Sequence, residues 1–143
     1  MDRIKITIPD GFLFSTSIEI RITDINYGNH VGNDNFLTLM HEARVRYLAS
    51  FGFTEMDCGG VGLIMSDAAI EFKKELFYGH TAIVSVKAGN INRVGFDLFY
   101  QIEFTGNNGE KTIAAKAKTG MLCYDYNKKK VVAVPQMLSE TLN

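Results

Sequence analysis

The sequence lacks the features that mark several large classes of protein. Its 143 residues contain only two cysteines, Cys58 and Cys123, with no CxxC pair and no Cys/His spacing typical of metal ligands. Lys and Arg total 15 against 16 Asp and Glu, so no broad basic surface can attract the phosphates of a nucleic acid. We interpret the cysteines as two reduced thiols of a cytoplasmic protein, and we expect neither a metal site nor a cofactor.

Long apolar runs, repeats and low-complexity tracts are also missing. No stretch approaches the roughly 20 apolar residues that a membrane-spanning helix needs. The segment Met1–Pro9 alternates charged and β-branched apolar residues and is not followed by the apolar run of a signal peptide. We therefore expect a single domain over residues 1–143 that is neither exported nor embedded in a membrane.

The hydrophobic period changes along the chain. Ile18–Thr23 alternates apolar and polar residues, which predicts a half-buried strand that could extend back toward Phe12. Over 34–50 the period becomes helical, with Asn33 or Asp34 as the N-cap. The apolar residues that recur at three- and four-residue steps are Phe36, Leu39, Met40, Ala43, Tyr47 and Leu48. Beyond Leu63 no second helical period follows, and four strands are predicted over 63–76, 80–92, 95–105 and 111–126.

One helix among five strands predicts an α+β fold in which a strongly curved antiparallel sheet packs on a single long helix. One helix cannot cover the whole sheet, and the strand over 111–126 carries apolar residues on both faces near Met121–Tyr124. A homodimer that continues the sheet or covers its free face would bury this surface. Pairing of dimers into a homotetramer stays open.

A polar loop, Asp24–Asn33, leads directly into the predicted helix. Free backbone N–H groups and the positive end of the helix dipole lie at such a junction, and both favour an oxyanion. In attack on a thioester or ester the carbonyl oxygen gains negative charge, which fixed donors can stabilise. The backbone amides of Gly32, Asn33 and Asp34 are therefore candidates for binding a substrate carbonyl.

Several polar side chains beside this junction are candidates for catalysis. His30 or Glu42 could activate a water molecule, and Asn26 could bind a carbonyl or hold that water. Each of these residues also has a purely structural interpretation, and the spacing of the residues taken alone favours it over a catalytic one. Asp24 and Asn26 can form Asx turns, His30 can pack against backbone, and Glu42 can pair with the arginine one turn later.

The run Arg21–Phe36, followed by His41–Arg44, resembles the opening signature of hotdog-fold acyl-CoA thioesterases of the hydroxybenzoyl-CoA thioesterase-like group. Those proteins typically read Asp-x-Asp-x-x-Gly-His-Val-Asn-Asn, then an aromatic residue, then Glu-Ala-Arg. Where this signature has glycine before histidine, the chain has Asn29. Ala69–Phe72 and Val132–Pro135 resemble later parts of the family. The resemblance implies a hotdog fold, with one long central helix wrapped by a curved five-stranded antiparallel sheet.

The resemblance also implies site residues, with one departure. Asp24 matches the first acidic position, but the second, often the catalytic carboxylate, is Asn26 here. An amide can act neither as a general base nor as a nucleophile. Plant acyl-ACP thioesterases of the same superfamily use an Asn and a His with an acidic residue. By analogy, Asn26, His30 and Glu42 are implied as catalytic, with Asp24 and Tyr27 in support.

Two functions from different classes are open at this point. The first is an acyl-CoA thioesterase in which activated water converts the thioester of CoA, or of acyl carrier protein, to free acid and thiol. The second is a non-hydrolytic accessory protein that binds acyl thioesters and has lost the carboxylate at Asn26. Dehydration of hydroxyacyl thioesters is less favoured, because on this fold that chemistry usually places His and an acid differently.

Overall fold

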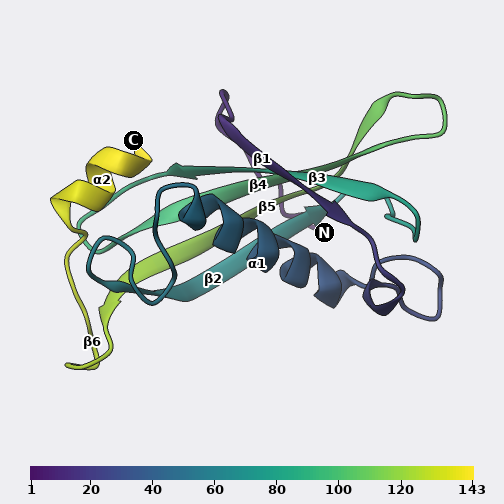
Figure 1. The fold of residues 1–143 in the computed structure, drawn as a ribbon. Coiled ribbons are helices and arrows are strands. Elements are labelled where there is room, and N and C mark those ends of the chain that lie inside the picture. The colour runs from purple at the N-terminus through teal and green to yellow at the C-terminus, as the bar shows by residue number, and fades with distance from the viewer.

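The computed structural model describes residues 1–143 and confirms the α+β fold (Figure 1). An antiparallel sheet runs in the order β1-β3-β4-β5-β2, and a short strand, β6, pairs with β5. The strands are β1 (Phe14–Glu19), β2 (Gly62–Phe72), β3 (Thr81–Gly89), β4 (Gly95–Thr105), β5 (Lys111–Asp125) and β6 (Lys130–Val131). The four predicted later strands are all present, although three of them are shorter than predicted.

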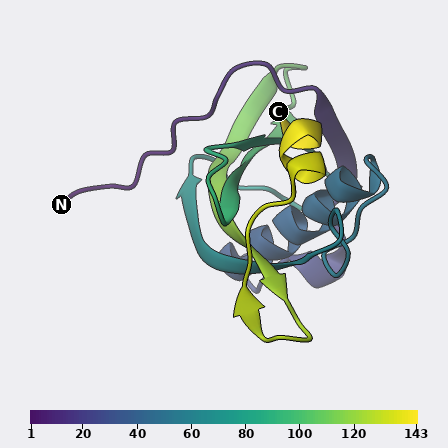
Figure 2. The same ribbon diagram turned by 90° about the vertical axis from the view of Figure 1, so that its left-hand side faces the viewer.

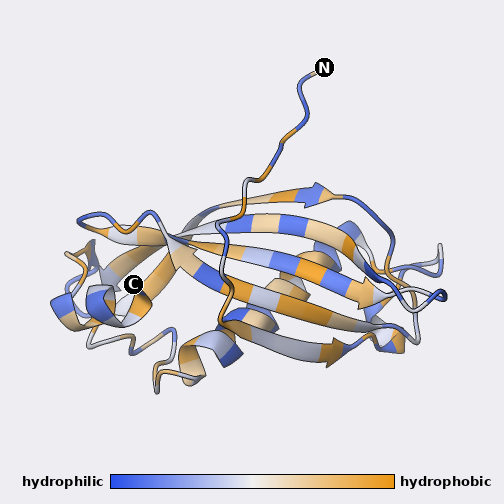
Figure 3. Cartoon of the chain, turned by 90° about the horizontal axis from the view of Figure 1, so that it is seen from above, coloured by the Kyte–Doolittle hydropathy of each residue, from blue (hydrophilic) through white to orange (hydrophobic).

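Helix α1 (Asn33–Ala49) is the long helix that the sequence predicts. The sheet curls around it, as the view along the molecule shows (Figure 2). The predicted apolar face is buried as expected: Phe36, Leu39, Met40, Ala43, Tyr47 and Leu48 all belong to the core. The strands that cover the helix alternate hydrophobic and hydrophilic residues (Figure 3), as a sheet with one buried face requires. Neither α1 nor α2 (Gln136–Leu142) has the length and apolar character of a membrane-spanning helix.

The structure adds two elements that the sequence reading missed, α2 (Gln136–Leu142) and β6. The sheet therefore has six strands instead of five, and the chain has two helices. Helix α2 is too short for its period to stand out, but Leu138 and Leu142 are buried in the core. It covers the end of the molecule opposite to the start of α1 (Figure 1).

The first strand lies earlier in the chain than the predicted Ile18–Thr23. It ends at Glu19, and Ile22–Asp24 forms a 3-10 turn, η1. The Asp24 carboxylate accepts a hydrogen bond of 2.8 Å from the Arg21 amide and closes this turn. Alternation of apolar and polar residues continued past the end of the strand, so the pattern alone could not locate that end.

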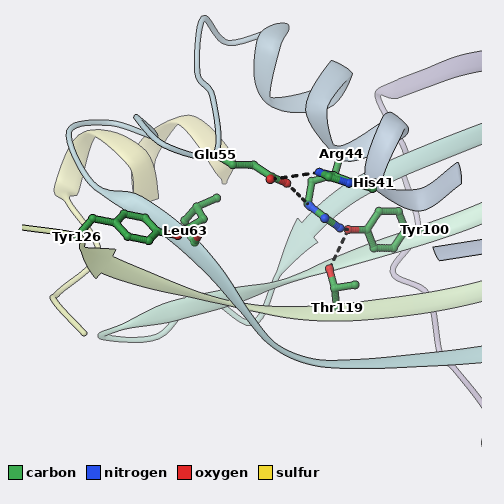
Figure 4. A network of polar contacts seen from close by, with 7 residues as sticks. All are labelled: His41, Arg44, Glu55, Leu63, Tyr100, Thr119 and Tyr126. Atoms are coloured by element: carbon green, nitrogen blue, oxygen red, sulfur yellow. Dashed lines mark hydrogen bonds and ion pairs between the residues drawn. The ribbon is translucent and has the colours of Figure 1, made fainter. Parts of the chain in front are cut away.

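A buried polar network fixes α1 to the sheet (Figure 4). Arg44 is 5% exposed; its Nε donates to Glu55 and its Nη1 donates to the Tyr100 hydroxyl at 3.1 Å. The Tyr100 hydroxyl in turn lies 2.8 Å from Thr119 Oγ1. Burial lowers the pKa of Arg44, but Tyr100 and Glu55 outweigh this effect and the pKa is raised overall. The guanidinium therefore stays charged and joins α1 to β4 and, through Tyr100, to β5.

Loss of this guanidinium should destabilise the fold. We expect Arg44→Ala to lower the free energy of unfolding by about 3 kcal/mol, because Glu55 and Tyr100 then lack their buried partner. Arg46→Ala, on the exposed face of the same helix, should cost about 0.5 kcal/mol. Urea denaturation of both variants measures the difference, and equal losses would contradict the role of the network.

The two cysteines should not react with thiol reagents in the folded protein. Burial raises the pKa of Cys58 to about 12 and that of Cys123 to about 11. The reactive thiolate is therefore scarce at about pH 8, where an exposed thiol reacts readily. We expect a chromogenic aromatic disulfide to detect neither thiol until denaturant is added. Rapid reaction of the native protein would show that the core opens there.

Candidate active site

The polar loop before α1 is a closed turn held by its own backbone. Ile25 and Val31 form an isolated antiparallel bridge, and the Asn26 amide donates to the His30 carbonyl at 2.9 Å. Asn29 adopts a left-handed conformation with φ 65°, which asparagine tolerates better than most residues. Asn29 thus takes the conformation that a glycine would adopt in this turn.

The Asn26 side chain is oriented by a hydrogen bond within the loop. Its Oδ1 accepts from the Gly28 amide at 2.8 Å, which is the Asx turn that its spacing favoured. The opposite end of the carboxamide faces the start of α1, with Nδ2 3.8 Å from where a Cβ at Gly32 would lie. Asn26 therefore presents an N–H donor, not an acceptor, to the helix end.

Helix α1 starts without a side-chain cap. Gly32 is the N-cap, so the expectation of Asn33 or Asp34 was wrong. The Gly32 carbonyl accepts from the amides of Asn35 and Phe36. The Gly32 amide points inward to the Asp24 carbonyl at 3.4 Å, so only Asn33 and Asp34 keep amides without an acceptor. Two of the three predicted donors are therefore available.

His30 lies beside Asn26, on the other side of Gly28. A Cβ at Gly28 would lie 3.1 Å from Asn26 Oδ1 and 3.2 Å from His30 Nε2, so only glycine leaves both groups in place. His30 Nδ1 lies 3.2 Å from the Val31 carbonyl oxygen. Because a carbonyl can only accept, this contact places the proton on Nδ1 and leaves Nε2 free to take one.

A pocket of about 260 Å³ joins His30 to the helix end. Phe36 and Phe72 form its apolar wall, with ring centroids 5.2 Å apart in an edge-to-face arrangement. The remaining lining residues are Val31, Asn33, Lys73, Lys74 and Glu75. The pocket therefore combines an apolar wall, a histidine and an unpaired backbone amide.

The other predicted residues lie elsewhere. Glu42 accepts from Arg46 Nε at 3.0 Å and lines a different cavity, of about 510 Å³, between β1 and α1. Asp24 is buried and lines that second cavity as well. Tyr27 is fully exposed at the tip of the loop. Within one chain the structure thus brings together Asn26, His30 and the helix amides but not Glu42 or Tyr27.

Sequence reasoning missed the second half of the pocket, which comes from the connection between β2 and β3. The predicted strand over 63–76 included Phe72 correctly but also Lys73, Lys74 and Glu75, which lie beyond the end of β2 and line the pocket. The strand ends at Phe72 because the amides of Lys73 and Lys74 both donate to the Ala114 carbonyl. A cluster of three charged residues at the end of a strand was the available signal.

With this geometry established, comparison with known proteins identifies the family. The profile of the thioesterase-like superfamily matches residues 20–142. The chain belongs to this superfamily. YneP of Bacillus subtilis (strain 168), a protein provisionally named an acyl-CoA thioesterase, is 31% identical over 110 residues, covering 76% of this chain and 77% of YneP.

Solved structures of thioesterases confirm the hotdog fold. A 4-hydroxybenzoyl-CoA thioesterase, solved as an Asp-to-Asn variant bound to 4-hydroxybenzoyl-CoA, superposes with a TM-score of 0.82 at 15% identity. The match covers 91% of this chain and 98% of that one. A 1,4-dihydroxy-2-naphthoyl-CoA thioesterase from Synechocystis gives 0.77 at 20% identity, covering 90% and 94%.

In this superfamily member the Asn26 turn should contribute to stability independently of any chemistry. We expect Asn26→Ala to lower the free energy of unfolding by about 1 kcal/mol, because the Gly28 amide loses its acceptor. Asn26→Asp keeps an acceptor oxygen and should be within about 0.5 kcal/mol of the parent. Chemical denaturation measures both. A destabilised Asp variant would mean that the amide N–H of Asn26 is also needed for folding.

Proposed function

We propose that this chain is an acyl-CoA thioesterase that hydrolyses its substrate to free acid and CoA. The observation that carries the proposal is a pocket lined by a histidine with a free Nε2 and by Asn33, whose backbone amide is unpaired. The Asn26 N–H and the unpaired Asp34 amide lie at the same helix start. Membership of the thioesterase-like superfamily and the relationship to YneP support the same reaction.

The thioester carbonyl oxygen accepts hydrogen bonds from the amides of Asn33 and Asp34, with Asn26 Nδ2 as a third donor. Water attacks the carbonyl carbon while His30 Nε2 takes one of its protons, and the carbonyl electrons become an oxyanion. When this intermediate collapses the C–S bond breaks, and the leaving sulfur receives the proton from His30. Donors fixed before the reaction stabilise the oxyanion by about 3 kcal/mol each.

The walls of the pocket favour a compact acyl group. Its volume of about 260 Å³ is just below the usual range of small-molecule sites, and Phe36 and Phe72 offer ring edges and faces to an aromatic or short acyl chain. The phosphates of CoA, or of the phosphopantetheine arm of acyl carrier protein, lie a full pantetheine length from the thioester and so outside this pocket. With an overall charge of −1, their binding falls to individual lysine or arginine side chains and not to the field of the whole protein.

The first experiment is release of CoA thiol from a panel of short, long and aromatic acyl-CoAs. We expect hydrolysis of aromatic or short substrates, and a fall in kcat of at least about 100-fold in His30→Ala because the general base is lost. Met56→Ala, an exposed change remote from the pocket, serves as the matched control. An absence of hydrolysis across the panel would overturn the proposal, and tight binding without hydrolysis would indicate an accessory protein instead.

Asn26→Asp tests the role of the amide. If Asn26 acts as a donor to the carbonyl, the carboxylate removes that donor and adds negative charge beside the oxyanion. We therefore expect kcat to fall about 10-fold or more, while the fold keeps its stability. The measurement is kcat for the preferred substrate. A rise in kcat would instead identify a site that has lost its carboxylate.

The working unit is proposed to be a homodimer, with a dimer of dimers as the larger alternative. Strand β2 ends the sheet with a free edge, and its residues Met65–Ala68 are all exposed, with Met65 at 45%. Such an edge is a template for pairing with a second copy. The buried cysteines support the predicted cytoplasmic location, which likewise stays a proposal.

Light scattering should give a mass of at least twice the 16.0 kDa of the chain. Met65→Glu introduces a charge at the β2 edge and should shift the equilibrium toward the monomer at low concentration. Met56→Glu, at a more exposed position outside the strand, should leave the mass unchanged. A monomeric parent protein would contradict the proposal.

A further inference from the structure

The proposed site contains a base, but Asn26 stands where a catalytic carboxylate was expected. Of the nearby carboxylates, Asp24 is committed to closing the η1 turn and Glu42 to Arg46 in another cavity. Glu75 is different. It lines the His30 pocket, its side chain is 62% exposed, and its Oε1 lies 3.8 Å from His30 Nε2.

The fold holds Glu75 at this place from both sides. Upstream, the amides of Lys73 and Lys74 both donate to the Ala114 carbonyl on β5. Downstream, the Leu76 carbonyl accepts from the Val31 amide at 2.8 Å. The connection between β2 and β3 is thereby tied to the polar loop directly beside His30, although the two segments are far apart in the sequence.

The same contacts orient the histidine. His30 and Phe77 form an isolated antiparallel bridge, and the two rings pack edge to face with centroids 6.4 Å apart. With Nδ1 at the Val31 carbonyl, Nε2 points toward Glu75. The only other histidine nearby, His80, cannot replace it as the base, because its Nδ1 accepts the Phe77 amide and its ring stacks on Phe104.

We propose that Glu75 is the catalytic carboxylate of this site and holds the attacking water together with His30. Two acceptors 3.8 Å apart can each accept one O–H of the same water at about 2.8 Å. As His30 takes its proton, the Glu75 carboxylate stabilises the imidazolium and retains the second O–H, which ends in the carboxylic acid product. Glu75 thus supplies from the β2–β3 connection the charge that Asn26 cannot supply from the loop.

The charges around His30 leave Glu75 free for this role. Lys73 pairs with Glu71 at 3.2 Å, and Glu75 makes no ion pair except with His30. Lys74 lines the same pocket, and Asp34 lies on the first turn of α1. Among these groups only the Glu75 carboxylate is placed within ion-pair distance of Nε2.

This inference rests on the proposed thioesterase activity, and the experiment separates the two. We expect Glu75→Gln, an isosteric change at an exposed position, to lower kcat about 10- to 100-fold while KM changes less than about twofold. Glu75→Asp should recover part of the loss. Glu140→Gln on α2 removes the same charge at the opposite end of the molecule and should leave kcat unchanged.

One further readout distinguishes chemistry from structure. In a His30→Ala background the Glu75→Gln change should cost less than about twofold, because the two groups act on one water. Additive losses, or a Glu75→Gln enzyme with parental kcat, would overturn the inference. A parent inactive on every acyl-CoA would instead overturn the thioesterase itself.

Discussion

The uncapped start of α1 is the constraint on which the site depends. A serine or aspartate at the cap would use one first-turn amide for its own side chain. Gly32 provides only a backbone carbonyl, and its missing Cβ leaves room for the Asp34 carboxylate, which would lie 2.6 Å from such an atom. The amides of Asn33 and Asp34 therefore stay available. The Arg44 network and the buried face of α1 hold them in place, so that little reorganisation is needed on substrate binding.

A second constraint is the contact between the polar loop and the β2–β3 connection. One hydrogen bond, from the Val31 amide to the Leu76 carbonyl, and the bridge between His30 and Phe77 bring the two segments together. In the proposed site the hydrogen-bond donors are the Asn26 side chain and the first amides of α1. The acceptors are the His30 ring and Glu75 of the β2–β3 connection. This division fits the roles we propose: Asn26 presents an N–H to the helix start, and the proposed negative charge is that of Glu75, 3.8 Å from His30 Nε2.

Much of the fold could be predicted because hydrophobic periods reflect burial directly. The apolar residues at helical spacing from Phe36 to Leu48 are the ones that α1 buries, and β4 has the bounds that its pattern indicated. Helix α2 was missed because seven residues contain less than two turns of pattern. The end of the first strand was misplaced because alternation continued into a turn closed by one carboxylate, that of Asp24.

The sequence by itself determined the fold class, the central helix, and the loop that holds Asn26 and His30 next to a helix start, since these depend on local patterns and on residues close together in the chain. Only the tertiary structure decided which groups meet. It separated Glu42 from His30, turned the Gly32 amide inward, and brought Glu75 to the histidine through contacts between loop, connection and β5. Such pairings depend on where strands end and how the sheet curves, and neither is a property of the local sequence.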